Sequence, residues 1–501
     1  MDTEAFEHHL TSPQGEGHIP EGAFTVTFGG GACCDEVTFS IQTDGLQVTD
    51  AGFTAEGCGA SHAAASAAVA LIRGRTLLEA ARIGQSEIAA ELGGLSPGKI
   101  HAAAVAVDAM ARALGRAVRE RGALPPPLAG GGGVEAGRTL VAMSGGVDSS
   151  VVALLCARDS EAVAVTLELW ADPENDSEKS CCSSSAVSQA RALAHQLGLP
   201  HFTLDLRDEF RRGVVEPFIE SYAAGETPNP CIGCNGHVRL DGMLEFADRL
   251  GCATLATGHY ARVEHGVGDA DLKDGPGMAA VPLLRIAVDP AKDQTYMLAA
   301  LEPQSLARLR FPLGEYRKPQ VRQLAAEAGM PVAVKSDSQD LCFLAGTDRG
   351  RFLARHGGII PQPGEIVTSD SGEVLGEHGG HELFTIGQRK GIGVGAAGEP
   401  LYVIDKDAAR NRLVVGRREQ LLTNRVRVRG ARLHRDGACV DRIKLRYQSE
   451  PLPARISGQA SPGRHRELLL ELHEPVAGAA PGQLACLMDG ELIVGWATIV
   501  R

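Results

Sequence analysis

The spacing of hydrophobic and polar residues changes character along the chain. Residues 25–40 and 46–53 alternate between apolar and polar positions, which is typical of β-strands, and a glycine-rich turn interrupts the first run. Residues 62–73 and 99–119 are rich in alanine and carry apolar residues at helical spacing, which predicts helices. The first part of the chain is therefore predicted to be a small α+β domain over residues 1–120.

A proline- and glycine-rich segment follows this domain. Residues 122–133 contain three consecutive prolines, which stiffen a chain, and four consecutive glycines, which loosen it. Little in this segment can pack into a core. We expect a linker over residues 121–138.

Beyond the linker, short apolar strands alternate with helices. Strand-like runs occupy residues 139–142, 162–169, 202–206 and 253–257, with helical spacing at 149–157 and 185–197. This rhythm predicts a parallel sheet covered on both faces, which makes residues 139–345 a doubly wound α/β domain.

The helical spacing fades after about residue 346. Short β-like runs separated by Gly, Pro and Asp occupy residues 413–415, 426–428, 466–472 and 492–500. We expect two small β-rich domains, one over residues 346–418 and one over 419–501.

Composition narrows the class of protein. The 501 residues are 44% hydrophobic and 22% charged, which fits about three folded domains. The net charge of −13 excludes a generally polycationic nucleic-acid coat but not a local basic groove. No run reaches the ~18 apolar residues needed to cross a bilayer, and no apolar core follows the acidic N-terminus as in a signal peptide. We therefore expect a cytoplasmic protein with no membrane partner.

The 12 cysteines are then expected to be reduced, which favours metal, redox or nucleophilic roles over a disulfide framework. Cys231 and Cys234 form a Cys-x-x-Cys pair, and prolines at 228 and 230 would hold both thiols outward. Such a pair is typical of half a zinc site, a redox pair or ligands of a cluster, with buried inert thiols as the alternative. A second Cys-x-x-Cys that would complete a zinc site is absent from the sequence.

Residues 141–150, Val-Ala-Met-Ser-Gly-Gly-Val-Asp-Ser-Ser, lead from a strand through a turn into a helix. Gly145 and Gly146 would let the backbone approach an anion, while the helix N-terminus and the serine hydroxyls supply hydrogen-bond donors. The loop lacks the Gly-Lys-Ser/Thr of a Walker sequence, so cleavage between β- and γ-phosphates is not indicated. The string predicts a pyrophosphate site, and an ordinary helix-capping turn is the alternative.

This string resembles the pyrophosphatase-type loop (PP-loop) of ATP-dependent, AMP-forming enzymes. Further strings resemble, in order, those of the tRNA-specific 2-thiouridylases. They are Thr-Pro-Asn-Pro at 227–230, Cys-Asn at 234–235, Ala-Thr-Gly-His-Tyr at 256–260, Lys-Asp-Gln-Thr-Tyr at 292–296, Cys-Phe at 342–343, Phe-Thr-Ile-Gly-Gln-Arg-Lys-Gly-Ile-Gly at 384–393 and Leu-Arg-Tyr at 445–447. The resemblance covers residues 139–501, about seven tenths of the chain.

The resemblance implies a reaction in which ATP adenylates the C2 oxygen of wobble uridine 34 in tRNA. Sulfur then replaces the oxygen, which leaves as part of AMP. By the same match, Cys342 carries the incoming persulfide, and Cys234 is the partner nucleophile that releases sulfur and transiently forms a disulfide with Cys342. Both steps need a thiolate, so we expect both cysteines to be partly exposed. The sulfur would come from a cysteine desulfurase or a sulfur-relay protein.

The resemblance also implies binding residues. Those for ATP are Ala142, Met143, Ser144, Gly145, Gly146, Val147, Asp148, Ser149, Leu167 and Gly258. Among these, Asp148 would help to hold Mg²⁺ against the pyrophosphate, because a carboxylate is tolerated near phosphates chiefly when a cation lies between them. Those for tRNA are His259, Lys292, Asp293, Gln294, Gln388, Arg446 and Tyr447.

Cys231 departs from some family members, which carry Asp at this position. Cys231, Cys234 and Cys342 could instead bind a [4Fe–4S] cluster through three of its irons, with the fourth free for a sulfide. The spacing leaves both routes open, the persulfide–disulfide cycle and delivery of cluster-bound sulfur.

The N-terminal domain resembles the NifU/IscU-type iron–sulfur scaffolds over residues ~20–118. The resemblance implies Cys33, Asp35, Cys58 and His101 as iron ligands or their neighbours, since soft thiolates suit iron. The third scaffold cysteine would follow His101, where this chain has Ala102. The domain then either holds iron or zinc differently or is a docking domain that no longer builds clusters. As a tethered unit, it would raise the local concentration of a sulfur or cluster handler.

Two rival functions remain from the sequence. One is another AMP-forming amide- or thio-transfer enzyme with the same loop, and the other is an iron–sulfur scaffold that carries a degenerate ATP domain. Binding of tRNA by an acidic protein requires a basic face. Arginines gathered between residues 389 and 432 predict such a face in the β-rich part, with an ordinary solvated surface as the alternative.

Overall fold

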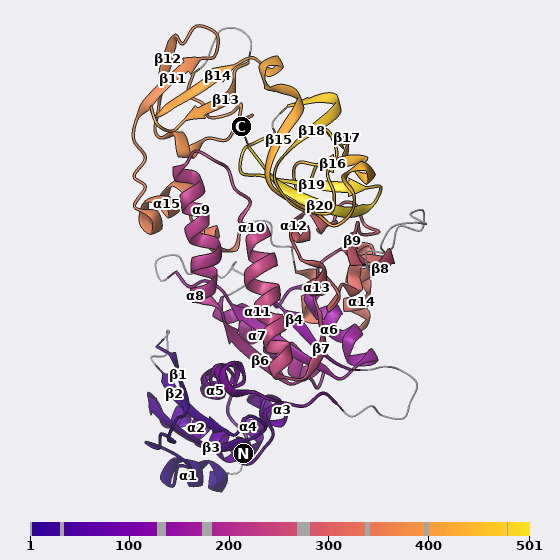
Figure 1. Ribbon diagram of the computed structural model, residues 1–501. Helices are drawn as coiled ribbons and strands as arrows, with labels where there is room; N and C mark the ends of the chain where they lie inside the picture. Colours follow the sequence, from indigo (N-terminus) through magenta and orange to yellow (C-terminus); the bar gives the residue numbers. More distant parts are fainter. Residues whose placement is uncertain are drawn as a thin grey trace. The chain divides into compact units, whose positions relative to one another are not determined.

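The computed structural model describes residues 3–30, 35–127, 137–172, 183–267, 281–335, 341–394, 400–477 and 479–500. The chain forms two compact units, each assembled from several segments of the sequence (Figure 1). The first unit comprises Met1–Arg207, Asp241–His259 and Arg308–Cys342. The second comprises Asp208–Leu240, Tyr260–Ala307 and Phe343–Arg501.

The first unit begins with the predicted α+β domain. An antiparallel sheet in the order β1-β2-β3 consists of β1 (Phe24–Gly29), β2 (Glu36–Thr43) and β3 (Val48–Glu56). Its helices are α1 (Thr3–Thr11), α2 (Gly59–Ile72), α3 (Leu77–Ala80), α4 (Gln85–Glu91) and α5 (Ile100–Arg121). Small alanines on α2 and α5 are fully buried, which lets both helices pack closely.

The same unit contains a parallel sheet in the order β10-β7-β4-β5-β6. Its strands are β4 (Arg138–Met143), β5 (Ala162–Glu168), β6 (His201–Asp205), β7 (Cys252–Ala256) and β10 (Leu309–Arg310). The connecting helices include α6 (Val147–Asp159), α7 (Ser184–Gln196), α11 (Asp241–Arg249) and α14 (Lys318–Glu327), with a 3-10 turn at Pro331–Val334. The strand order reverses between β4 and β7, so the doubly wound prediction is confirmed, and the carboxyl ends of these two strands are the expected ligand position.

The second unit contains the β-rich part. One sheet has the order β12-β11-β14-β13, formed by β11 (Gly364–Thr368), β12 (Val374–His378), β13 (Tyr402–Asp407) and β14 (Arg412–Gly416). A second sheet runs β15-β18-β17-β16-β19-β20 and closes through pairing of β15 with β20. Its strands are β15 (Leu422–Leu433), β16 (Arg442–Lys444), β17 (Leu452–Ile456), β18 (Gly463–Ala477), β19 (Leu484–Asp489) and β20 (Leu492–Ile499). The predicted β-rich class is confirmed, and closure into a barrel leaves these strands without free edges.

Two further strands join this barrel sheet from far away in sequence. β8 (Arg262–Val267) pairs with β9 (Val281–Arg285), and β9 pairs with β20. Sequence spacing placed residues 262–285 in the α/β domain. The second unit also contains α8 (Arg207–Phe210, from Asp208 on), α9 (Glu216–Ala223), α10 (Pro230–Gly233), α12 (Thr295–Leu298), α13 (Pro303–Leu306) and α15 (Arg349–Gly357), with π-helical turns at Arg211–Val215 and Cys234–Leu240.

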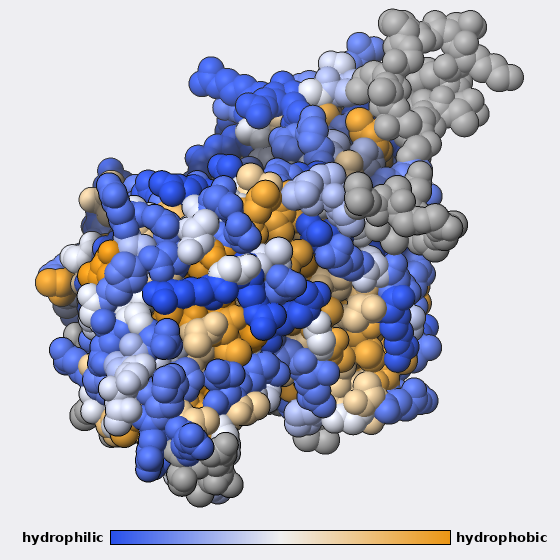
Figure 2. All heavy atoms as spheres, turned by 90° about the horizontal axis from the view of Figure 1, so that it is seen from below, coloured by the Kyte–Doolittle hydropathy of each residue, from blue (hydrophilic) through white to orange (hydrophobic). Residues whose placement is uncertain are grey.

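No helix among the described residues is long and apolar enough to cross a membrane. Figure 2 shows a face on which hydrophobic and hydrophilic side chains are interspersed. Large exposed apolar side chains such as Ile19 and Leu46 are scattered, which is ordinary for a protein surface.

Candidate functional site

The turn between β4 and α6 has the geometry of an anion-binding loop. Gly145 has a φ of +66°, and a Cβ on it would lie 2.8 Å from the carbonyl oxygen of Ala186, so only glycine fits. Gly146 is the N-cap of α6. The Ser149 hydroxyl accepts a hydrogen bond from the backbone N–H of Ser144 at 3.1 Å, which closes the turn. The first N–H groups of α6 therefore point towards the carboxyl end of the sheet.

The loop after β7 lies against this turn. A Cβ on Gly258 would lie 3.1 Å from the backbone nitrogen of Ser149 and 3.3 Å from the Cβ of Asp148. Because β4 and β7 are neighbours at the reversal of strand order, the structure brings together Gly258 and the loop predicted to bind ATP. His259 follows, with its Nδ1 2.8 Å from the Thr257 hydroxyl and its ring packed edge-on to Phe311.

Two lysines from the end of the unit reach the same loop. Lys318, at the start of α14, is 8% exposed, and its Nζ lies 2.8 and 2.7 Å from the two carboxylate oxygens of Asp148. Lys335 donates to the carbonyl oxygen of Gly145 at 3.1 Å and to the side chain of Gln189 at 2.9 Å. Asp148 already accepts a cation here, so its carboxylate suits the predicted Mg²⁺.

The remaining residues predicted for ATP lie at the carboxyl end of the sheet. Ala142 and Met143 end β4, and Val147 begins α6. Leu167 lies one residue before the end of β5 and is 6% exposed. Their placement fits a nucleotide pocket at the switch point, and their individual contacts with ATP stay a prediction.

Of the three cysteines predicted to handle sulfur, two are half-buried and one is buried, and they belong to both units. Cys231 is half-buried in α10, where Asn229 caps the helix by accepting from the Cys231 N–H at 3.1 Å. Cys234 begins the following π-helical turn and is 7% exposed. The expectation that Cys234 is partly exposed is therefore wrong for this structure, because the turn directs its side chain into the interior.

Cys342 is half-buried, as expected, and starts a 3-10 turn whose next residue, Phe343, packs among three aromatic rings. Cys342 belongs to the first unit, whereas Cys231 and Cys234 belong to the second. The joint action of Cys234 with Cys342 and the three-cysteine cluster both stay predictions. Cys33 lies outside the described residues.

Most residues predicted to contact tRNA belong to the second unit, and several gather around Tyr447. Burial raises the pKa of Tyr447, Asp293 and Cys231 act in the same direction, and Lys292 opposes them. Arg446 is exposed, and one of its terminal nitrogens would lie 3.8 Å from a Cβ on Gly387, next to Gln388. These side chains therefore form one neighbourhood, which includes Cys231.

Two members of this predicted set are engaged within the protein. The buried carboxylate of Asp293 accepts from Lys444 at 3.3 Å and from the Thr295 hydroxyl at 2.8 Å. The Gln294 side chain accepts from the backbone N–H of Tyr260 at 3.0 Å. Contact of Asp293 and Gln294 with tRNA stays a prediction, but their hydrogen bonds within the protein support the segment that presents Lys292.

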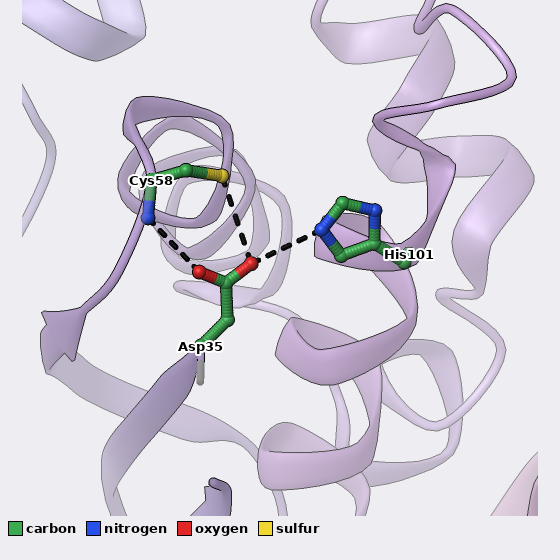
Figure 3. A group of neighbouring side chains, drawn as sticks. All are labelled: Asp35, Cys58 and His101. Atoms are coloured by element: carbon green, nitrogen blue, oxygen red, sulfur yellow. Dashed lines mark hydrogen bonds and ion pairs between the residues drawn. The ribbon is translucent and has the colours of Figure 1, made fainter. Parts of the chain in front are cut away.

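A second candidate site lies in the α+β domain. Ligand atoms of Asp35, Cys58 and His101 all lie within 4.8 Å of one another, and Figure 3 shows the three side chains converging on the Asp35 carboxylate. His101 Nε2 lies 3.1 Å from Asp35 Oδ2, and the Cys58 N–H donates to Oδ1 at 2.9 Å. Burial would raise the pKa of Asp35, but hydrogen bonds from Cys58, Ser61 and His101 outweigh it and lower this pKa.

The residues of this second site could hold a small ion. Gly57 has a φ of +140°, and a Cβ on it would lie 2.1 Å from Asp35 Oδ1, so glycine lets the carboxylate approach the Cys58 turn. A carboxylate, a thiol and an imidazole suit zinc or iron. Ala102, at the position of the expected third cysteine, is fully buried and offers no ligand atom.

Comparisons with known proteins match four successive parts of the chain to family models. Residues 2–121 match the NifU-like N terminal domain, and 137–346 match the tRNA methyl transferase HUP domain. Residues 350–417 match the tRNA methyl transferase PRC-barrel domain, and 419–499 match the aminomethyltransferase beta-barrel domain. A curated relative from Rubrobacter xylanophilus, the bifunctional protein NifU/MnmA, is 42% identical over 98% of this chain and 97% of its own length.

This chain belongs to the bifunctional NifU/MnmA family. Relatives named tRNA-specific 2-thiouridylase MnmA, from Zymomonas mobilis and Chloroflexus aggregans, are 40% and 42% identical over 72% of the chain. The match spans 92% and 98% of their own lengths. The NifU-like domain of the bifunctional family is therefore an addition to an MnmA part that these relatives carry alone.

For this NifU/MnmA chain, sequence reasoning missed the role of the two lysines. Lys318 is 170 residues away from Asp148, and Lys335 is 190 residues away from Gly145. The only available signal near Lys318 was the Lys-Pro pair at 318–319, because a proline in the first turn is typical of a helix N-terminus.

Proposed function

We propose that this chain adenylates the C2 oxygen of wobble uridine 34 in tRNA with ATP and replaces that oxygen with sulfur. As a NifU/MnmA family member, the chain is a tRNA-specific 2-thiouridylase fused to a NifU-like domain. The observation that carries the proposal is the turn at Ser144–Ser149, which joins a helix N-terminus, an acidic side chain and two lysines at the switch point of a parallel sheet.

The loop accounts for an AMP-forming reaction. The N–H groups of α6 and the hydroxyls of Ser144 and Ser149 would hold the β- and γ-phosphates, and Asp148 would hold Mg²⁺, which neutralises the pyrophosphate as it leaves. Lys318 and Lys335 supply positive charge at a loop that lacks the Walker lysine. The uridine oxygen attacks the α-phosphorus, the bond to the β-phosphate oxygen breaks, and pyrophosphate departs.

In the second step, cysteines would transfer sulfur to the activated uridine. In the persulfide route, the terminal sulfur on Cys342 attacks C2, and AMP leaves with the C–O bonding electrons. The Cys234 thiolate then attacks the Sγ of Cys342, which releases 2-thiouridine and forms a Cys234–Cys342 disulfide. A thiol reductant must return two electrons to restore both cysteines.

In the alternative sulfur route, Cys231, Cys234 and Cys342 would hold a [4Fe–4S] cluster, which would supply the sulfur as sulfide. The proximity of Cys231 to Tyr447, on which Lys292 also acts, supports a role for Cys231 near the RNA. Iron content of anaerobically purified wild-type protein and a Cys231→Ala variant distinguishes the routes, because only the cluster route requires iron bound through Cys231.

The partners follow from the chemistry. The substrate tRNA would contact His259, Lys292, Gln388, Arg446 and Tyr447, and a cysteine desulfurase or sulfur-relay protein would load Cys342. We place the reaction in the cytoplasm, where tRNA and reduced thiols coexist. Asp35, Cys58 and His101, with Cys33, would hold iron or zinc as cargo in the NifU-like domain.

Replacing Cys342 with serine tests the function. We expect tRNA treated with Cys342→Ser protein, ATP and a persulfide donor to contain no 2-thiouridine by mass spectrometry, while ATP binding survives. The matched control is Cys439→Ser, another half-buried cysteine, which should thiolate normally. Thiolation by the Cys342 variant would contradict the proposal, and wild-type protein that neither binds ATP nor forms AMP would favour a scaffold with a degenerate ATP domain.

A further inference from the structure

Helix α5 of the NifU-like domain is buried on nearly all sides, although its own sheet covers only one of them. From Ala106 to Val118, every residue except Arg112 and Arg116 is buried. Burial on this many faces requires neighbours beyond the sheet of its own domain. Within its own domain α5 packs against β1, β2, α2 and α4, and it also packs against β6 and α11 of the catalytic domain, which lie in the same compact unit.

β6 is an edge strand, and the NifU-like domain meets the backbone groups on its free side. Pro200 O bonds to β5 through the Ala164 N–H, so residues 201, 203 and 205 present their backbone groups to the other side. The His201 N–H donates to the carbonyl oxygen of Ala81 at 2.9 Å, and Arg119 donates to the Asp205 carbonyl at 2.6 Å.

The backbone of Thr203, the middle one of these three residues, lies directly against α5. A Cβ on Gly115 would lie 1.9 Å from the carbonyl oxygen of Thr203. Glycine at this position allows the helix backbone to approach the strand, and no other residue fits without a shift of the helix. An uncovered strand edge invites pairing with other chains, so a helix along it removes an aggregation hazard.

A buried charge network joins the two domains beside this contact. Asp108 on α5 accepts from Arg191 at 2.8 Å and from the Ser188 hydroxyl at 3.0 Å, both on α7. Arg112 donates to Glu168 at the end of β5 at 3.0 Å and also pairs with Asp108. Asp108 and Arg191 are each 3% exposed, so an unpaired partner would leave a buried charge uncompensated.

The described start of the linker is also anchored. The Ala123 N–H donates to the carbonyl oxygen of Gly45, and the Leu124 N–H donates to that of Arg249 at the end of α11. Arg138 donates to the carbonyl oxygen of Pro125 at 3.2 Å.

We propose that the NifU-like domain is a fixed structural component of the catalytic domain, with α5 covering the free edge of β6, rather than a carrier that swings on the linker. The metal-ligand group at Asp35, Cys58 and His101 includes the first turn of α5, so docking fixes its position relative to the parallel sheet. The advantage of the fusion is then a set distance rather than a raised concentration around a flexible tether.

The proposal is tested on the full chain with a protease recognition sequence inserted after Gly131. After cleavage, we expect the two fragments to elute together in size-exclusion chromatography at about 1 μM and moderate salt. Separation of the wild-type fragments under these conditions would overturn the proposal. The result does not depend on tRNA or sulfur, so it fails or succeeds independently of the thiouridylase reaction.

The Gly115→Ala variant tests whether the fragments associate through the contact between α5 and β6. Alanine favours a helix over glycine, so loss of association would come from the clash with Thr203 rather than from weaker helix formation. We expect at least tenfold weaker association of the cleaved fragments. The matched control is Gly98→Ala, where a Cβ would meet nothing within 4 Å, and its fragments should stay together.

Hydrogen exchange of the uncut chain distinguishes loss of docking from unfolding of the NifU-like domain in the Gly115→Ala variant. With Gly115→Ala, amides of β6 should exchange faster while those of β2 and β3 stay protected. If β2 and β3 also lose protection, the NifU-like domain has unfolded, and Glu168→Gln then replaces Gly115→Ala as the test variant. Glu168→Gln weakens the ion pair with Arg112 from the catalytic side and adds no volume. Unchanged association in whichever folded variant is used would contradict docking through α5.

Discussion

At the residue scale, the chemistry of the phosphate loop depends on side chains far away in sequence. Lys318 and Asp148 form an ion pair in which the lysine is almost fully buried, and such a pair is retained more readily for function than for stability. Lys318 lies beside Asp148 as its counter-ion. We expect the same lysine to contact a phosphate oxygen of bound ATP.

We therefore predict that Lys318→Met binds ATP about 10- to 100-fold more weakly, the range for a lost charge-assisted hydrogen bond of about 1.5–3 kcal/mol. AMP lacks the β- and γ-phosphates, so its affinity should change little. Calorimetric titration with both nucleotides checks this, with Lys99→Met as the control. An equal loss for ATP and AMP would show that Lys318 supports the fold of the pocket instead.

The second residue-scale prediction concerns the metal group of the NifU-like domain. Cys58→Ser removes a thiolate from a three-ligand group and should weaken binding of Zn²⁺ at least tenfold in a competition assay with a chelator. Ala102→Cys adds a thiol next to His101 and should tighten binding by a similar factor. Equal affinity in all three proteins would mean that Zn²⁺ binds elsewhere, and Cys439→Ser serves as the unaffected control.

At the element scale, the turn before α6 requires a left-handed residue with no side chain. Gly145→Ala places a Cβ 2.8 Å from the Ala186 carbonyl, so the turn must move and its N–H groups lose their common direction. We predict at least tenfold weaker ATP binding. Gly329→Ala has nearly the same φ, +64°, but meets nothing within 4 Å, so it should cost about 1–2 kcal/mol of stability and leave ATP affinity unchanged.

Equilibrium dialysis with labelled ATP measures the affinities of both variants, and thermal unfolding measures their stabilities. Normal ATP affinity in Gly145→Ala would mean that the turn tolerates the shift and that the phosphates bind elsewhere.

The elements themselves could be predicted from the sequence because their signals are local. The strand at Arg138–Met143 and the turn after it carry a continuous apolar run and adjacent glycines, and both were placed correctly. The pairing of β8 and β9 with the C-terminal barrel could not be predicted, because it depends on register with β20, more than 200 residues later. Likewise, the alanines of α5 are compatible with packing against one sheet or two, so its packing against β6 could not be predicted from the sequence.

At the scale of the whole molecule, buried histidines at the domain contact link stability to pH. His201 bonds through its N–H to Ala81 and through its ring to the Thr166 hydroxyl at 2.8 Å. Burial lowers the pKa of His201 well below its ordinary value, and Arg191, His195 and Arg112 act in the same direction. The pKa of His195, which contacts the same Ala81 carbonyl, is also lowered by burial.

The direction of the effect follows from proton binding. Below the ordinary histidine pKa of about 6.5, the unfolded chain binds a proton that folded His201 does not bind, so stability falls as the pH decreases. The fall for one such histidine approaches about 1.4 kcal/mol per pH unit. Carboxylates whose pKa is lowered in the fold, such as Asp205, contribute only at more acidic pH, so the window between pH 6.5 and 5 isolates the histidines.

Urea unfolding between pH 7.5 and 5 measures this slope. The chain has two tryptophans, Trp170 in the first unit and Trp496 in the second, so a Trp496→Phe background lets fluorescence report on the first unit alone. His201→Asn, which does not titrate, should reduce the slope by about 1.4 kcal/mol per pH unit relative to the same background. An unchanged slope would mean that His201 is protonated in the folded state, and the packing of β6 against the NifU-like domain would then have to admit a buried charge or water.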